Sequence, residues 1–152
     1  MNGTATDWLA HLRDLQQMPV AQFGRVLRRL RQRLDARLEP YGITGVQFGL
    51  LALVAEEEGI AQTRLQQRLA IEGATLTQLL QRLEREGWVV RTCDRADRRR
   101  QRVWLTDRGR ELLPRIAEEV ERHRHEMQRG FTIEELALLS EMLRRIEENA
   151  QS

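Results

Sequence analysis

The sequence predicts a mainly α-helical chain that carries one small β-hairpin. Apolar side chains recur at helical spacing along most of the 152 residues, and residues 91–106 show the alternation of a strand pair. Charged residues make up 32% of the chain and aromatic residues only 5%, a composition typical of helices with exposed, charged surfaces. The length predicts a single domain, residues 1–152, with a core of its own.

Residues 1–38 are expected to form helices that pack against other helices. Residues 1–19 hold a short helical pattern around Trp8. Residues 20–38 continue with a regular apolar stripe and six arginines, and Pro40 and Gly42 mark the end of this helix. The stripe consists of Phe23, Leu27, Leu30, Leu34 and Leu38.

Three more helices are expected between residues 44 and 85. Thr44 and Gln47 have the spacing of a capping box, which opens a helix to about residue 57. The glutamates at residues 56–58 oppose the dipole at the end of that helix, so we expect this end to fray. Two short helices follow, at residues 61–70 and 73–85, separated by a tight turn.

Two short helices joined in this way are the layout of a helix-turn-helix DNA reader, in which the second helix enters a groove. One face of the helix at residues 73–85 carries small, hydroxyl, amide and basic side chains. Carboxylates, which phosphates would repel, are missing from this face until Glu84. A pair of helices packed merely as core is the alternative interpretation. The face comprises Ala74, Thr75, Thr77, Gln78, Gln81 and Arg82.

The predicted hairpin is strongly basic. Residues 91–110 contain eight arginines and three aspartates, a net charge of +5 in a chain whose total is +2. Val103 and Leu105 share one strand face, Arg102 and Trp104 share the other, and the polar residues 94–97 are expected to form the turn. This ordered pattern favours an electrostatic footprint for nucleic acid over a solvated charged loop.

The chain is expected to end in two helices that contribute to dimerisation. Thr106 is placed to cap a helix to about residue 129, and Thr132 with Glu135 forms a second capping box. These helices have more apolar surface than a small domain hides, which predicts a helical dimer interface. The predicted sub-regions are dimerisation helices at 1–38 and 107–149 and a DNA-binding lobe at 44–106.

These motifs resemble the MarR (multiple antibiotic resistance regulator) family of winged helix-turn-helix transcription factors. The resemblance covers about residues 20–148 and is most specific in ATLTQLLQRLEREGWVVR and DRADRRRQRVWLTDRG. The family pattern is a threonine-rich reading helix, Leu-Glu-x-x-Gly, an Asp-x-Arg wing and Leu-Thr-x-x-Gly. Here it is matched by Leu83, Glu84, Gly87, Asp97, Arg99, Leu105, Thr106 and Gly109.

The resemblance implies a winged helix-turn-helix flanked by N- and C-terminal dimerisation helices, acting as a homodimer on a double-stranded DNA operator. The helix at 73–85 would enter a major groove and the wing a minor groove, with Arg99 in the groove and Asp97 holding its guanidinium. Gln78 stands where many members carry arginine or another residue, so no operator sequence can be transferred. The implied DNA-binding residues are Gln62, Thr63, Ala74, Thr75, Thr77, Gln78, Gln81, Arg82, Arg95, Asp97, Arg98 and Arg99.

Members of the family usually repress nearby genes and release DNA when a small aromatic or phenolic effector binds between the reader and the dimer helices. By segment position, the residues expected near such an effector are Arg25, Arg29, Tyr41 and Phe48. Core packing for Phe48 and a solvated face for the arginines are the alternatives.

Other functions are less well supported by the sequence. Redox regulation through Cys93, which lies in the first wing strand near Arg91 and Arg95, is one alternative. A second is a dimeric helical protein-interaction module that has lost DNA binding. The three histidines are His11, His123 and His125. The last two are two residues apart on a helix and point away from each other, and no cluster of His, Cys and Glu is evident, so no metal site is expected.

No enzyme, cofactor or membrane association is expected. The sequence contains no glycine-rich phosphate loop, nucleophile elbow or metalloprotease spacing. The longest apolar run, residues 48–55, is far shorter than the roughly 20 residues that span a bilayer. The N-terminus lacks the layout of a signal peptide, which, with the single cysteine, predicts a cytoplasmic protein.

Overall fold

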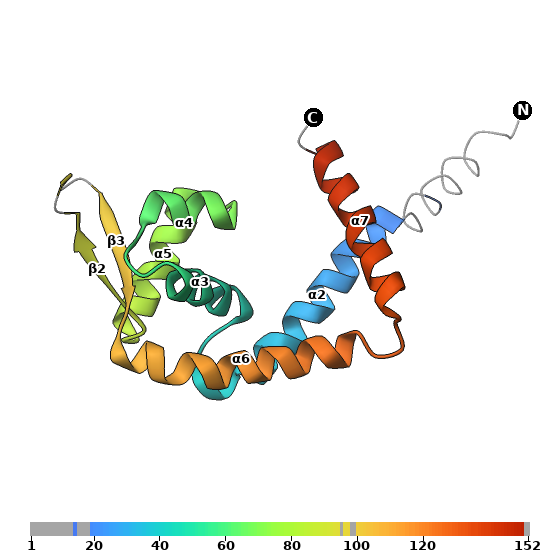
Figure 1. The fold of residues 1–152 in the computed structure, drawn as a ribbon, viewed down its shortest axis with the longest axis horizontal. Helices are drawn as coiled ribbons and strands as arrows, with labels where there is room; N and C mark the ends of the chain where they lie inside the picture. The colour runs from blue at the N-terminus through green and yellow to red at the C-terminus, as the bar shows by residue number, and fades with distance from the viewer. Residues whose placement is uncertain (1–13, 15–18, 95, 98–99, 151–152) are drawn as a thin grey trace, which may run out of the picture. The chain divides into compact units, whose positions relative to one another are not determined.

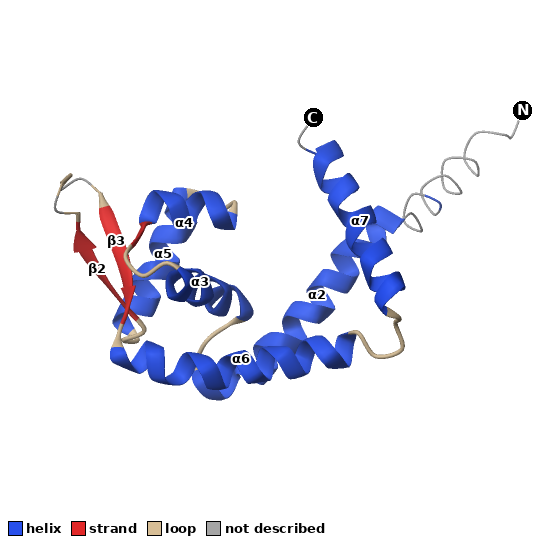
Figure 2. Cartoon of the chain, viewed as in Figure 1, coloured by secondary structure: helices blue, strands red, loops and turns tan. Residues whose placement is uncertain are grey.

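The structure, a computed structural model, describes residues 14, 19–94, 96–97 and 100–150. The chain divides into two compact units, Met1–Ile116 and Ala117–Ser152. The described residues are mainly helical and form six α-helices, α2 to α7, with a small antiparallel sheet, as expected (Figure 2). The helix expected around Trp8 falls outside the described residues.

Helices α2 (Pro19–Leu38) and α3 (Gly45–Glu56) form the first part of the larger unit. The 3-10 helix Glu39–Tyr41 separates them, and Gly42 follows it in the left-handed region at φ 72°. The predicted capping box is confirmed, because the Gln47 amide donates to the Thr44 hydroxyl at 3.3 Å and the Thr44 amide donates to the Gln47 side chain at 2.8 Å.

Helices α4 (Gln62–Leu69) and α5 (Gly73–Arg85) form the predicted helix-turn-helix, with α3 beside them (Figure 1). Ala70 ends α4 in the left-handed conformation at φ 51°, which turns the chain toward α5 within a few residues. Leu76, Leu80 and Leu83 of α5 are fully buried, so this helix has one fixed face toward the core.

The wing is part of a three-stranded antiparallel sheet rather than an isolated hairpin. Strand β3 (Gln101–Leu105) lies between β2 (Val89–Cys93) and β1 (Ile60–Ala61). Val103 of β3 lies opposite Arg91 of β2 on one side and opposite Ile60 of β1 on the other. Two residues give no alternation to detect, which is why the sequence pattern missed β1.

The core of the larger unit is apolar and continuous through its helices and sheet. The predicted alternation of β3 is confirmed, with Val103 and Leu105 buried and Arg102 exposed. The fully buried apolar side chains that fill most of this core are Leu38, Leu50, Leu51, Val54, Ile60, Leu65, Leu76, Leu80, Leu83, Val103 and Ile116.

Helix α6 (Asp107–Met127) begins in the larger unit, and α7 (Ile133–Ala150) lies wholly in the smaller one. The second predicted capping box is confirmed, because the Thr132 amide donates to Glu135 at 2.8 Å and the Glu135 amide donates to the Thr132 hydroxyl at 3.2 Å. Among the described residues no single helix is long and apolar enough to cross a membrane, and the stretch Ala21–Tyr41 with Gly45–Glu56, bent by 70°, passes that test only as a pair.

The three glutamates at and just after the end of α3 each have an arginine partner. The prediction that this end frays did not take these partners into account. Glu56 pairs with Arg68 at 2.7 Å and Glu57 pairs with Arg64 at 3.2 Å, both from α4. Glu58 accepts from Arg110 of α6 at 2.9 Å. Cations supplied by neighbouring helices offset the like charges that the local sequence shows.

Candidate nucleic-acid interface

The outward face of α5 is set by its buried leucines. Ala74, Thr75, Gln78 and Gln81 are exposed, as a reading face requires. Thr77 is different, because its half-buried hydroxyl donates to the carbonyl of Gly73 at 2.8 Å and accepts from the Gln62 side chain at 3.5 Å. Two predicted contact residues, Thr77 and Gln62, therefore also join α4 to α5.

The last turns of α5 carry two arginines on the outward side. Arg82 donates to Glu86 at 2.9 Å and is half exposed. Arg85, which the sequence prediction left out, is exposed on the same side and has no side-chain partner among the described residues. Its spacing of seven residues from Gln78 could have revealed it, because residues seven apart share a helix face.

The N-terminus of α4 faces the start of β3, at the loop end of the wing. Ala61 precedes the helix and supplies no side-chain cap, so the first amides of α4 are open to an external acceptor. A hollow of about 170 Å³ lies here. Its lining residues are Gln62, Thr63, Gln66, Arg100 and Gln101. Open amides with the positive end of the helix dipole favour a phosphate at this place.

Some arginines of the basic segment, residues 91–110, are bonded within the molecule, so less of its +5 charge is available to DNA than the sequence suggests. Arg91 pairs with Glu84 at 2.7 Å. Arg108 donates to the Glu86 carbonyl at 3.0 Å and lies 5.3 Å from the centre of the Trp88 ring. Neutralising partners that lie outside the counted segment, such as Glu84, reduce the positive potential that a +5 segment suggests.

The loop end of the wing, directly after β2, is held by Asp94. Its carboxylate accepts from the amides of Ala96 at 2.7 Å and Asp97 at 3.2 Å, which forms the predicted turn. It also pairs with Arg102, which donates to the Gly59 carbonyl at 2.8 Å. The amide of Ala96, then Arg102, hold the pKa of Asp94 below its usual range.

The tip of the wing lies largely outside the described residues. Arg95, Arg98 and Arg99 fall there, so the predicted minor-groove contact of Arg99 stays a prediction. Asp97 is half-buried and pairs with Arg100 at 3.4 Å. The expected hold of Asp97 on the Arg99 guanidinium likewise stays a prediction.

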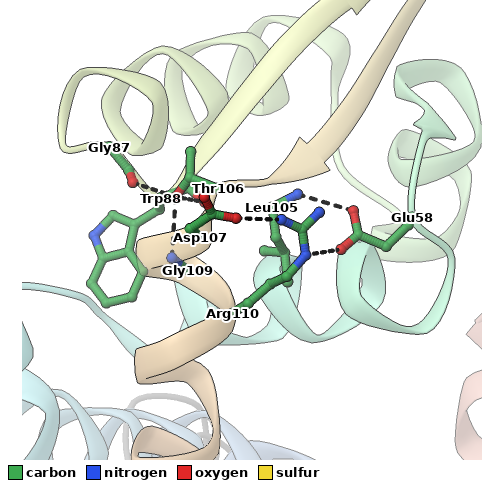
Figure 3. Close-up of polar contacts among 8 residues, drawn as sticks. All are labelled: Glu58, Gly87, Trp88, Leu105, Thr106, Asp107, Gly109 and Arg110. Carbon is green, nitrogen blue, oxygen red and sulfur yellow. Dashed lines mark hydrogen bonds and ion pairs between the residues drawn. The ribbon is translucent and has the colours of Figure 1, made fainter.

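The joint between the wing and α6 explains the Leu-Thr-x-x-Gly motif (Figure 3). The Thr106 hydroxyl donates to the Gly87 carbonyl at 2.6 Å and accepts from the Gly109 amide at 3.1 Å, which caps α6. A Cβ on Gly109 would lie 2.6 Å from the Trp88 carbonyl oxygen, so a side chain does not fit there. Leu105 is buried in the core and completes the motif.

Residues predicted for other roles occupy varied positions. Arg25 and Arg29 are exposed on α2, whereas Tyr41 and Phe48 are partly buried, and effector binding by these four stays a prediction. Cys93 is an exposed free thiol that accepts from Gln101 at 3.4 Å. No group of three or more metal-ligating side chains occurs within the described ranges.

Comparisons with known proteins point to one family. The model of the MarR family matches residues 41–100. The HTH-type transcriptional regulator PecS of Dickeya dadantii (strain 3937) is 30% identical over 148 residues, which cover 93% of this chain and 89% of PecS. The HTH-type transcriptional regulator TtmR of Methylorubrum extorquens (strain PA1) is 40% identical over 90 residues, but the match spans 43% of the length of TtmR.

Solved structures agree with these sequence relatives. The crystal structure of MarR is 31% identical and superposes with a TM-score of 0.73, covering 88% of this chain and 98% of that one. The S. aureus MepR–DNA complex superposes with a TM-score of 0.82 at 23% identity, covering 87% of this chain and 98% of that one. At this identity, the similarity shows a shared fold and nothing more. With a relative that is 30% identical over 93% of this chain, and with a shared winged helix-turn-helix fold, this chain belongs to the MarR family of DNA-binding transcriptional regulators and is not an enzyme.

Proposed function

We propose that this protein is a ligand-responsive repressor that binds a double-stranded DNA operator as a homodimer. The observation that carries the proposal is the outward face of α5. Gln78, Gln81, Arg82 and Arg85 supply amide and guanidinium donors there, and the neighbouring carboxylates Glu84 and Glu86 are paired with arginines. Amide and guanidinium groups are suited to base edges and phosphates of a major groove.

The other contacts follow from how the elements of the reading unit are joined. With α5 in a major groove, the open amides of α4 at Gln62 and Thr63 would take a backbone phosphate. The β2–β3 wing would reach the adjacent minor groove, where Arg99 would insert as the family resemblance implies.

A second copy of the chain is the expected partner of the smaller unit. Leu138, Leu139, Met142 and Leu143 of α7 are between 41% and 56% exposed, which is costly for side chains of this size. Burial of this face against a partner copy would offset that cost and give two reading helices for two half-sites. Residues 1–38 and 107–149 are the proposed dimerisation helices.

Repression would end when a small aromatic or phenolic effector favours a dimer whose two reading helices no longer match successive grooves. Arg25, Arg29, Tyr41 and Phe48 are the residues proposed to bind it. A regulator of this kind acts where the chromosome is, so we also propose a cytoplasmic location.

The proposal is tested by fluorescence anisotropy with a duplex from the region upstream of the protein's own gene. We expect preferential binding over a scrambled duplex, weakening steeply between about 50 and 200 mM salt. Addition of phenolic anions should release the duplex. Absence of binding to either duplex at low salt would favour the alternative of a protein-interaction module without DNA affinity.

Redox regulation through Cys93 is a second candidate, because this thiol is exposed on the wing. Oxidation would place a bulkier group on β2, next to the segment proposed to enter the minor groove. Peroxide should then weaken DNA binding by the wild-type chain and leave a Cys93→Ser variant unaffected. Equal loss of binding in both proteins would exclude Cys93 as the sensor.

A further inference from the structure

We infer that Glu84 positions the wing relative to α5 and so determines how well these two elements fit neighbouring DNA grooves. The inference rests on the proposed DNA-binding function and adds a residue to it. Glu84 lies in the last turn of α5, and its partner Arg91 lies in β2. Their contact therefore connects the two parts of the molecule that would meet DNA.

Three hydrogen bonds converge on the one carboxylate. The Arg91 guanidinium donates to Oε2 of Glu84 from Nε at 3.1 Å and from Nη2 at 2.7 Å. The backbone amide of Arg91 donates to Oε1 at 3.2 Å. The side chains of Arg91 and Glu84 are only 22% and 36% exposed, so competition from water is reduced.

The backbone bond makes this contact more than a surface ion pair. Strand β2 is at the edge of the sheet, with β3 on its other side, so alternate amides of β2 have no strand to bond. Glu84 accepts from one of these amides, at Arg91. The carboxylate thus fixes the main chain of the wing, and a change in its position would carry the whole strand with it.

One substitution distinguishes a positioning role from a simple charge effect, because the two roles predict opposite changes in DNA affinity. A carboxylate close to DNA repels phosphates, so simple electrostatics predicts that Glu84→Gln tightens binding. If Glu84 positions the wing, Glu84→Gln weakens binding, because the wing no longer keeps its alignment to α5. Glu72 provides the matched control, since it is exposed at the other end of α5 and makes no side-chain cap bond. We expect Glu72→Gln to bind as tightly as wild type or more tightly.

The experiment uses the full chain and the duplex that the wild-type protein selects from a random pool, with anisotropy measured across a salt series. We expect Glu84→Gln to raise Kd about threefold to tenfold, the range of coupling between bonded groups. The slope of log K against log salt should also fall, by about 0.9 for each phosphate that the misaligned wing no longer neutralises. A smaller folded fraction would raise Kd without changing this slope, so the slope separates positioning from instability.

Two further variants complete the test. Arg91→Gln should weaken binding, and the double variant with Glu84→Gln should be little worse than either single one, because both break the same contact. Binding by Glu84→Gln that equals or exceeds wild type at an unchanged slope would overturn the inference and leave the proposed function standing. If the wild-type chain selects no duplex, the proposed function fails and the inference with it.

Discussion

The two units of this chain differ in how far they bury their apolar side chains. The buried apolar residues of the described chain all lie between Leu38 and Ile116, within the larger unit. In the smaller unit, Ile133 is 82% exposed and Leu138 is 56% exposed. The larger unit thus has an apolar core of its own, although Val26 and Leu27 of α2 are 52% and 47% exposed, whereas the smaller unit has an apolar face and no buried apolar side chain among its described residues. The difference suggests that the core that positions the reading helix does not depend on assembly.

The largest expected effect tests the core of the larger unit. Leu80 is fully buried in α5, so Leu80→Ala should lower the free energy of unfolding by about 2–5 kcal/mol through reduced burial and the cavity left behind. Urea denaturation at two protein concentrations measures this effect. The urea midpoint of each protein should be the same at both concentrations if the larger unit owes its stability to its own core, and a midpoint that rises with protein concentration would contradict the comparison.

The next effect tests the smaller unit. Glutamates in place of Leu139 and Met142, which are 41% and 48% exposed on α7, should separate a dimer into single chains and leave the helix content unchanged. We expect the dimer dissociation constant to rise at least about tenfold, measured by light scattering across a dilution series. Arg144→Glu changes the net charge by the same amount on the polar side of α7 and is the control. A molar mass unaffected by the double substitution would exclude this face as the interface.

A moderate effect is expected where the wing meets the start of β1. Gly59 has φ 76°, and a Cβ there would lie 2.5 Å from the Trp104 ring. Gly59→Ala should therefore destabilise the protein by about 1–3 kcal/mol, through backbone strain and the displaced indole. Thermal unfolding measures this destabilisation. Gly49→Ala is the control, because its Cβ would meet nothing within 4 Å.

A smaller effect concerns acid stability, because carboxylates are used differently in the two units. Asp94 joins separate parts of the wing, whereas Glu121 pairs with Arg124 on the same helix. Hydrogen bonds lower the pKa of both carboxyls in the folded protein. Their stabilisation is therefore present above the unfolded pKa of about 4 and is lost as pH falls through the lower folded pKa. Melting temperatures from pH 6 to 2.5 should depend less on pH in Asp94→Asn than in Glu121→Gln, and the reverse order would contradict this view.

The smallest effect sharpens the description of the reading face. Arg85→Gln should weaken DNA binding a few-fold and lower the salt slope by about 0.9, as expected for one phosphate contact. Arg64→Gln is the control, because Arg64 is also an exposed arginine but is paired with Glu57. Equal slopes for the two variants would remove Arg85 from the interface.

Local patterns in the sequence predicted the elements well. Periodicity and capping residues placed α3, α4 and α5 within one or two residues of their observed bounds, because these signals come from neighbours along the chain. The alternation of Val103 and Leu105 likewise identified the buried face of β3.

Contacts between distant residues were beyond the reach of these patterns. Arg110 and Glu58 are 52 residues apart, and nothing local pairs them. Arg91 was counted as part of a DNA-facing charge, but its guanidinium forms an ion pair with Glu84. A charge count treats every arginine as available, and only the tertiary structure shows which ones are already engaged.

The arrangement of the small sheet also bears on how the protein behaves at high concentration. Exposed sheet edges are templates on which another chain can add a strand, a common route to aggregation. Here one edge is β1, which is only two residues long. The other is β2, where the Glu84 carboxylate already accepts from the Arg91 amide and places charge beside the strand. Both edges therefore present few free hydrogen-bonding groups to a strand from another molecule. We expect the short three-stranded sheet to be exposed at the protein surface without promoting aggregation.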